Sequence, residues 1–316
     1  MAVLYGWQGT LLDVLNRFNK YHVNGKKVVS YGTMQKRKET LFQGFGDLRE
    51  KFKFKTVLAF RGKHMEYLVQ KWEQDGLSAS SICNKYNIFK TFATWIGKRS
   101  MILPLDRYME DSSRAKRSYV AVEPKTWRSK GFDAQALIDE IRKKEPLIAD
   151  SLTLQYVFGL RSKESLLLRP HLADKGSFLL IEHGAKGGRS RHIEIRNAYE
   201  RKVINDIKSR IPLGCSMIPK EKTLKQWLNH YYAVIRSHGI KRSEGITAHG
   251  LRHENLANLY KDITGHDTPA EGGNLKSQNK ALDRHARQAV SERAGHSREA
   301  ISSVYIGSKK KKRGSG

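Results

Sequence analysis

Three short stretches decide the fold: GLRSKE at residues 159–164, HGLRH at residues 249–253, and GH at residues 295–296 followed by Tyr305. Each string alone is common in unrelated proteins. Their order along the chain and the nine positions between His296 and Tyr305 are the informative part. Together they combine arginines, histidines and a phenol, which suits nucleophilic chemistry on an anionic ester.

The composition indicates a polyanionic partner. Lys and Arg number 59 against 31 Asp and Glu in 316 residues, a formal net charge of +28, so we expect an extended polyanion as partner, with nucleic acid as the first candidate. A hydrophobic content of 39% is enough for a folded chain and excludes general disorder. No apolar run approaches the ~20 residues of a membrane span, and the first ten residues lack the basic start of a secretion signal. We therefore expect a cytoplasmic, DNA-associated protein with no membrane partner.

The sequence predicts no metal site and no cofactor. Cys83 and Cys215 lie far apart with no CxxC pattern, so we expect buried free thiols and neither a disulfide nor a zinc site. The chain contains no GxxxxGK[ST] loop for ATP. His249 and His253 have the spacing of a zinc-protease helix, but Gly250 stands where that motif needs its glutamate. The expected chemistry therefore uses neither metal nor ATP.

Residues 1–118 are expected to form a helical DNA-binding domain. Apolar residues recur at helical spacing from Val57 to Asp75, and Ser78 is expected to cap a second helix. A basic linker is expected between Leu105 and Gly131. Basic side chains in this part of the chain are the candidate contacts to DNA phosphates. They are Lys36, Arg37, Lys38, Lys53, Lys55, Lys85, Arg114 and Arg117.

Residues 119–307 are expected to form a second, helical domain that contains one β-hairpin. Phe178–Glu182 and His192–Arg196 have the character of strands and flank a glycine-rich turn. Lys186 and Arg189 lie at the tip of this hairpin. Arg189 is a further candidate DNA contact.

Helices are expected on both sides of the hairpin. Asp133 can cap one that runs to Pro146, an apolar helix follows over 147–158, and Thr247 can cap another that runs to Tyr260. The polar stretch 264–280 is expected to be an inserted loop, with helical segments resuming at 284–294 and 298–305. Residues 308–316 are expected to be a flexible basic tail.

The combined motifs resemble the tyrosine recombinase (phage integrase) family, and their surroundings resemble the integrases of mobile elements and conjugative plasmids. The resemblance implies a mainly α fold with a small β-hairpin in the catalytic domain, and a two-domain DNA clamp of a core-binding domain and a catalytic domain. It implies a site-specific recombinase that cuts and rejoins DNA through a covalent 3′-phosphotyrosine. Matched position by position, the implied catalytic residues are Arg161, Lys186, His249, Arg252, His296 and Tyr305.

The chemistry of these side chains agrees with that set. In-line attack spreads negative charge over the phosphoryl oxygens, which the planar guanidinium groups of Arg161 and Arg252 are suited to bind. Tyr305 is the expected nucleophile, and because a phenol has a pKa of about 10, it needs a base such as His249 or strong local positive charge. Lys186 is suited to protonate the departing 5′ oxygen.

Other polar residues are expected to support the site or the core. His296 is expected to hydrogen-bond the phosphate, and Glu164 to orient Arg161. Arg252 and His296 are 44 positions apart, so the insertion must loop out for His296 to join the site. His253 is expected to be structural. Tyr231, Tyr232 and Tyr260 are expected to be core or surface aromatic residues.

The resemblance also implies an assembly of four protomers on two DNA sites, monomeric or dimeric away from DNA, with accessory directionality or host DNA-bending proteins as further partners. A type IB topoisomerase or a telomere-resolving enzyme shares the nucleophile and the cations but needs no pairing of two sites. A catalytically silent, architectural DNA-binding protein could use the same fold. Strand-exchange products separate the first alternative from a recombinase, and a trapped covalent complex separates the second.

Overall fold

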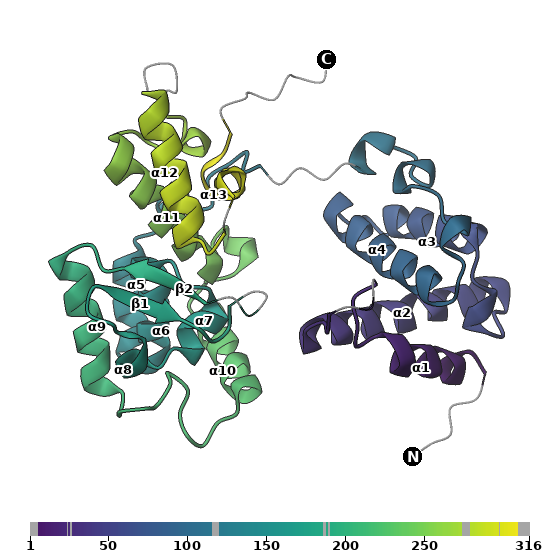
Figure 1. Cartoon of the computed structure of the whole chain (residues 1–316), viewed down its shortest axis with the longest axis horizontal. Coiled ribbons are helices and arrows are strands. Elements are labelled where there is room, and N and C mark those ends of the chain that lie inside the picture. Colours follow the sequence, from purple (N-terminus) through teal and green to yellow (C-terminus); the bar gives the residue numbers. More distant parts are fainter. Residues whose placement is uncertain are drawn as a thin grey trace. The chain divides into compact units, whose positions relative to one another are not determined.

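The computed structural model of the chain describes residues 6–23, 25, 27–115, 120–185, 188, 190–273, 279–296 and 298–308. The chain folds as two compact units, Met1–Ser118 and Tyr119–Gly316 (Figure 1). Within the described residues, helices predominate, and one two-stranded antiparallel sheet lies in the second unit. The predicted fold class is therefore confirmed. None of the described helices has both the length and the apolar character that crossing a bilayer requires.

The first unit is built around a cluster of aromatic side chains. Its α-helices are α1 (Trp7–Phe18), α2 (Tyr31–Phe52), α3 (Gly62–Gln74) and α4 (Ala79–Trp95). Phe45 of α2 lies with its ring centroid 4.9 Å from that of Phe92 and 5.4 Å from that of Phe89, both on α4. All three rings are fully buried. A Cβ added to Gly44 would lie 2.5 Å from Cζ of Phe89, so this glycine lets α2 pack closely on α4.

The predicted helices of the first unit are partly confirmed. Ser78 caps α4, as expected, with its hydroxyl accepting a hydrogen bond from the backbone N–H of Ser81. The predicted start at Val57 is wrong, because Val57–Ala59 is a short 3-10 turn that leaves Leu58 47% exposed, and α3 begins only at Gly62. The sequence analysis also missed α1 and α2.

Helix α6 (Pro146–Phe158) lies at the centre of the second unit and is buried on almost every side. It packs against α5 (Ala134–Arg142), α7 (Ser162–Leu167), α9 (Ala198–Arg210) and α11 (Ala248–Thr264). The remaining α-helices are α8 (Pro170–Ala173), α10 (Leu224–Ser237), α12 (Lys280–Arg293) and α13 (Ser303–Ile306). The predicted start of α5 and end of α6 are confirmed: Asp133 caps α5 by accepting from the N–H of Ala136, and Gly159 ends α6 with a φ of +65°. The predicted end of α5 at Pro146 is wrong, because α5 ends at Arg142 and Pro146 is the first residue of α6.

The predicted hairpin is present as β1 (Phe178–Ile181) and β2 (Arg191–Glu194). The strands pair in antiparallel register, with Ile181 opposite Arg191. The predicted second strand, His192–Arg196, starts one residue too late and ends two too late. Arg196 has left the strand because its backbone N–H and its guanidinium both bind the carboxylate of Glu200 on α9.

The predicted basic linker from Leu105 to Gly131 is wrong at both ends. Leu105 is buried in the core of the first unit. In the second unit, Trp127 is fully buried and donates its indole N–H to the carbonyl of Thr247 at 2.8 Å. The backbone N–H of Ala121 donates to the carbonyl of Ser303 at 2.9 Å. Residues 116–119 lie outside the described residues.

Three smaller expectations are refined by the structure. The polar insertion is shorter than predicted, because α11 continues to Thr264, a 3-10 turn forms at Pro269–Glu271, and α12 begins at Lys280; residues 274–278 are outside the described residues. Cys83 and Cys215 are free thiols, as predicted, but they are only half-buried and not buried as expected. The three tyrosines predicted to be core or surface residues are so placed: Tyr231 and Tyr260 are fully buried, and Tyr232 is 43% exposed.

Candidate active site

One face of α11 presents three polar side chains. His249, Arg252 and His253 are three and four positions apart, which places them on the same side of a helix. The ring centroids of His249 and His253 are 5.1 Å apart. Arg252 and His253 are buried, whereas part of the His249 side chain reaches solvent. The HGLRH string therefore brings these three side chains together near the start of α11.

The two predicted arginines converge on one main-chain carbonyl. Because α6 ends at Gly159 in a left-handed turn, Arg161 stands at the start of α7. Nη2 of Arg161 donates to the carbonyl oxygen of Ala294 at 3.1 Å, and Nη2 of Arg252 donates to the same oxygen at 2.5 Å. Arg252 also donates to the carbonyl of Gly159. Main-chain atoms from two distant segments thus hold two guanidinium groups side by side.

Tyr305 on α13 lies directly against Arg252. Its hydroxyl is 3.4 Å from Nη2 of Arg252, and the guanidinium carbon is 5.4 Å from the centroid of the phenol ring. Tyr305 is only 7% exposed and Arg252 is fully buried. Burial lowers the pKa of Arg252 to about 10, which is still well above neutral pH. The phenol oxygen therefore has a permanent positive charge beside it.

Three histidines surround the phenol ring. Its centroid is 5.0 Å from that of His253, 6.4 Å from that of His249 and 6.5 Å from that of His296. The pKa of His249 is lowered to about 4, first because surrounding protein displaces water and then because Arg252 and Arg161 are close. Burial likewise lowers the pKa of His253 to about 3. Both rings are therefore neutral at pH 7, and burial makes each a weaker base than a free imidazole.

Glu164 lies at the centre of the cationic cluster. Its side chain is fully buried, and its Oε1 is 2.6 Å from Nη1 of Arg161, the contact that the sequence analysis expected. Its Oε2 accepts the backbone N–H of Arg161 at 2.7 Å and lies 3.9 Å from Nη1 of Arg252. Burial alone would raise the pKa of Glu164, but hydrogen bonds and charge from Arg191 and Arg161 lower it to about 2. The carboxylate is therefore ionised and braces the arginines.

Arg191 belongs to this cluster and was missed. It lies on β2 two positions before Ile193, which is buried. Side chains two apart on a strand share a face, so this alternation was a signal that Arg191 points toward the interior. Its guanidinium contacts both carboxylate oxygens of Glu164.

Some predicted site residues fall outside the described part of the chain. They are Arg117, Lys186 and Arg189. Elsewhere in the described ranges, no group of three His, Cys, Asp or Glu side chains is arranged to hold a metal ion.

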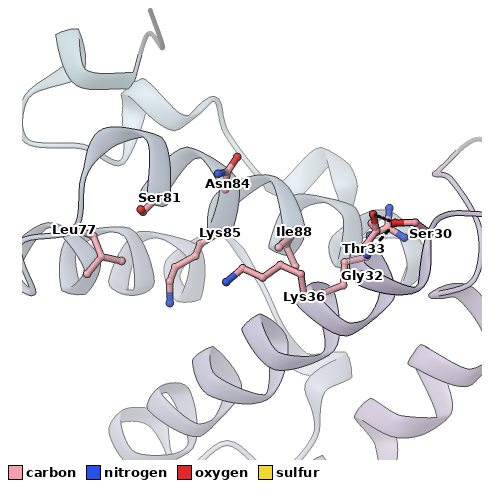
Figure 2. A pocket seen from close by; sticks show the side chains of 10 residues that line it. Ser30, Gly32, Thr33, Lys36, Leu77, Ser81, Asn84, Lys85 and Ile88 are labelled. Atoms are coloured by element: carbon pink, nitrogen blue, oxygen red, sulfur yellow. Dashed lines mark hydrogen bonds between the residues drawn. The ribbon is translucent and has the colours of Figure 1, made fainter. Parts of the chain in front are cut away.

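A groove on the first unit gathers two of the predicted lysines. Its volume is about 590 Å³, and it lies between α2 and α4. Figure 2 shows the side chains of Lys36 and Lys85 extending into it from these helices. Lys85 donates to Oε1 of Gln43 at 2.9 Å and lies 5.5 Å from the ring centroid of Trp72. Burial and the charge of Lys36 lower the pKa of Lys85, so this groove concentrates positive charge.

Arg37, a predicted DNA contact, lines the same groove but is held by main-chain carbonyls. The residue is only 8% exposed, and its Nη1 donates to the carbonyls of Asn19 and Tyr21 at 3.2 and 3.0 Å. Its guanidinium carbon also lies 5.4 Å from the ring centroid of Trp95. Arg37 therefore fastens the connection between α1 and α2 to the body of the unit.

The other described basic candidates lie at the surface. Arg114 is paired with Glu73 at 3.7 Å and donates to the carbonyl of Leu77 at 3.3 Å. Three lysines are exposed on or just after α2: Lys38, Lys53 and Lys55. They remain predicted DNA contacts.

A comparison with protein families finds a match to the family model described as Integrase over residues 125–257. This stretch includes Arg161, His249 and Arg252, and ends before His296 and Tyr305. The resemblance to the tyrosine recombinase family is confirmed. None of the curated proteins compared with the chain matches it.

Solved integrase structures share the recombinase fold at low sequence identity. A lambda integrase dimer bound to a COC′ core site is 16% identical, with a TM-score of 0.58 over 94% of this chain and 77% of that one. Lambda integrase residues 75–356, also as a dimer on a COC′ core site, give 14% identity and a TM-score of 0.59 over 97% of both chains. The Tn1549 transposon integrase, residues 82–397 with circular intermediate DNA, gives 14% and 0.55 over 94% of this chain and 95% of that one.

Proposed function

We propose that this chain is a site-specific DNA recombinase of the integrase type that cleaves and rejoins DNA strands through a covalent 3′-phosphotyrosine at Tyr305. The observation that carries the proposal is the 3.4 Å distance between the hydroxyl of Tyr305 and Arg252, whose Nη2 shares the carbonyl of Ala294 with Arg161. A phenol beside two guanidinium groups is equipped to attack a phosphodiester.

The proposed reaction exchanges one phosphodiester for another. The oxygen of Tyr305 forms a bond to phosphorus, the bond from phosphorus to the 5′ oxygen breaks, and the phenolic proton passes to His249. Arg161 and Arg252 bind the non-bridging oxygens, where negative charge accumulates. Lys186 donates a proton to the departing 5′ oxygen. Because the phosphotyrosine is itself an ester, a 5′ hydroxyl reverses the step without ATP.

Two further side chains have proposed roles in the same step. His296, whose ring centroid is 6.5 Å from that of the phenol, hydrogen-bonds the phosphate. Glu164 orients Arg161 through the 2.6 Å contact and the backbone N–H that it accepts. The low pKa of Glu164 supports this role, because the carboxylate stays charged throughout the neutral range.

The proposed partner is double-stranded DNA, gripped by both units. The net charge of +28 and the lysine groove of the first unit support it. The titles of the similar structures name a lambda integrase dimer on a core site, Tn1549 integrase with circular intermediate DNA and a lambda integrase tetramer on a Holliday junction. By analogy we propose four protomers on two DNA sites, monomers or dimers away from DNA, and a role in the movement of a mobile element.

A trapped adduct tests the proposal. On a nicked duplex that loses its 5′ fragment after cleavage, the wild-type chain is expected to form a denaturant-resistant protein–DNA complex, and Tyr305→Phe none, with DNA binding retained. Tyr232→Phe is the matched control, because this tyrosine is 43% exposed on α10. An adduct that persists in Tyr305→Phe would refute the assignment.

Two outcomes separate the alternatives. A wild-type chain that binds DNA but never forms the adduct would be an architectural protein. An adduct without recombinant products from two duplexes would indicate a topoisomerase or a telomere-resolving enzyme. Joined products from two duplexes support a recombinase.

A further inference from the structure

Arg191 and Glu164 form an ion pair with two parallel contacts within the cationic cluster. Nη1 of Arg191 lies 2.6 Å from Oε1 of Glu164, and Nη2 lies 2.8 Å from Oε2. The side chain of Arg191 is 8% exposed and that of Glu164 is fully buried. A fork that binds both oxygens of a carboxylate fixes its plane as well as its position.

The carboxylate that Arg191 holds is the one that holds Arg161. Oε1 of Glu164 accepts from Nη1 of Arg161 at 2.6 Å, and Oε2 accepts the backbone N–H of Arg161 at 2.7 Å. Any rotation of the carboxylate would therefore move the guanidinium that faces Ala294. The contacts thus connect Arg191 on β2, through Glu164, to Arg161 at the start of α7.

Arg191 also fills the space beneath the turn after α12. Gly295 has a φ of +70°, and a Cβ placed on it would lie 2.8 Å from Cδ of Arg191. The residues on either side of Gly295 are Ala294, whose carbonyl accepts hydrogen bonds from Arg161 and Arg252, and His296, whose ring centroid is 6.5 Å from that of Tyr305. One side chain thus contacts both segments that frame the place for the phosphate.

We propose that Arg191 is a positioning residue for strand cleavage. It holds the plane of Glu164 so that Arg161 presents its fork to the phosphate, and it supports the turn that carries the Ala294 carbonyl. A lysine at this position could carry the charge but not the two parallel hydrogen bonds. This inference rests on the proposed function and adds to it a residue from β2.

The first test compares matched arginine variants in the adduct assay. Arg191→Lys is expected to slow adduct formation by ~10–100-fold, the usual effect of losing a residue that orients a functional group, with DNA affinity unchanged. Arg201→Lys is the control, because Arg201 also binds a buried carboxylate, Asp174, at 2.8 Å but contacts none of the residues around Tyr305. If Arg191→Lys fails to fold, Arg191→Gln, which keeps a planar donor, takes its place.

The second test asks whether the effect passes through Arg161. If it does, Arg161→Lys combined with Arg191→Lys is expected to be no slower than Arg161→Lys alone. A methylphosphonate linkage, which lacks one charged oxygen, is expected to shrink the defect of Arg191→Lys, whereas a general structural defect would persist on that substrate.

The outcomes separate this inference from the proposed function. A wild-type chain without adduct overturns both. A normal wild-type adduct with equal rates for Arg191→Lys and Arg201→Lys, or with additive losses in the double variant, overturns the role of Arg191 alone.

Discussion

Replacing Arg252 and Arg161 separately by lysine is expected to produce similar losses of activity but different losses of stability. In the proposed reaction both arginines bind the phosphate, and removal of one such donor costs ~10²–10³ in rate. Their surroundings differ, however. The side chain of Arg252 is fully buried, whereas that of Arg161 is 21% exposed.

The stability difference follows from the partners that each variant leaves behind. A lysine at position 252 cannot reach both the carbonyl of Gly159 and that of Ala294, so one hydrogen bond from a charged donor is lost, worth about 1.5–3 kcal/mol. For a unit of this size each kcal/mol lowers the Tm by ~2–4 °C, which gives a decrease of roughly 3–12 °C. A lysine at position 161 can still pair with Glu164 at the partly solvated edge, so its Tm is expected to change by less than about 3 °C.

Calorimetry of the two variants, combined with adduct formation on the nicked duplex, measures both quantities. A fully active Arg252→Lys chain would refute the role of the guanidinium fork in binding phosphate. An inactive Arg252→Lys chain with an unchanged Tm would refute the argument from burial, because it would mean that the carbonyls of Gly159 and Ala294 do not need their partner.

Three further outcomes are expected. Burial lowers the pKa of His253 to about 3, so between about pH 6.5 and 3 the unfolded state binds a proton at this residue that the folded state does not. The free energy of unfolding therefore falls as the pH drops through that range. In urea titrations at pH 7 and 4.5, His253→Asn is expected to show a smaller fall than the wild-type chain. Gly44→Ala is expected to destabilise the first unit by ~1–3 kcal/mol through overpacking against α4, while Gly46→Ala, which has open space at its Cβ, is expected to stabilise it by ~0.5–1 kcal/mol; equal midpoints in denaturant would contradict this. Lys36→Gln is expected to reduce the slope of log Kd against log salt by ~0.9, whereas Lys71→Gln, which removes a lysine already paired with a neighbouring carboxylate, should leave the slope unchanged.

The predictable parts of the fold are those governed by local sequence. The end of α6 at Gly159 and the cap of α5 at Asp133 depend on residues within one turn. The hairpin was recognisable because alternation and glycines are local signals. The start of α3 was missed because Leu58 continues the apolar spacing although its side chain faces solvent.

Long-range partners were beyond a local interpretation of the sequence. The run Lys36, Arg37, Lys38 looks uniformly basic, but a helix turns by about 100° per residue, and the middle side chain points inward to the carbonyls after α1. Arg191 was missed because its partner, Glu164, is 27 positions away on α7. The contact between Arg161 and Glu164 was predictable because both belong to the same helical turn.

Three guanidinium groups face the single carboxylate of Glu164: Arg161, Arg191 and Arg252. The centre therefore carries mutual repulsion until an anion arrives, and any anion that enters relieves it. Sulfate or residual nucleic acid in a preparation should for this reason raise the melting temperature of the second unit. The anions that remain after purification are therefore expected to change the measured melting temperature, and samples that differ in anion content are not directly comparable.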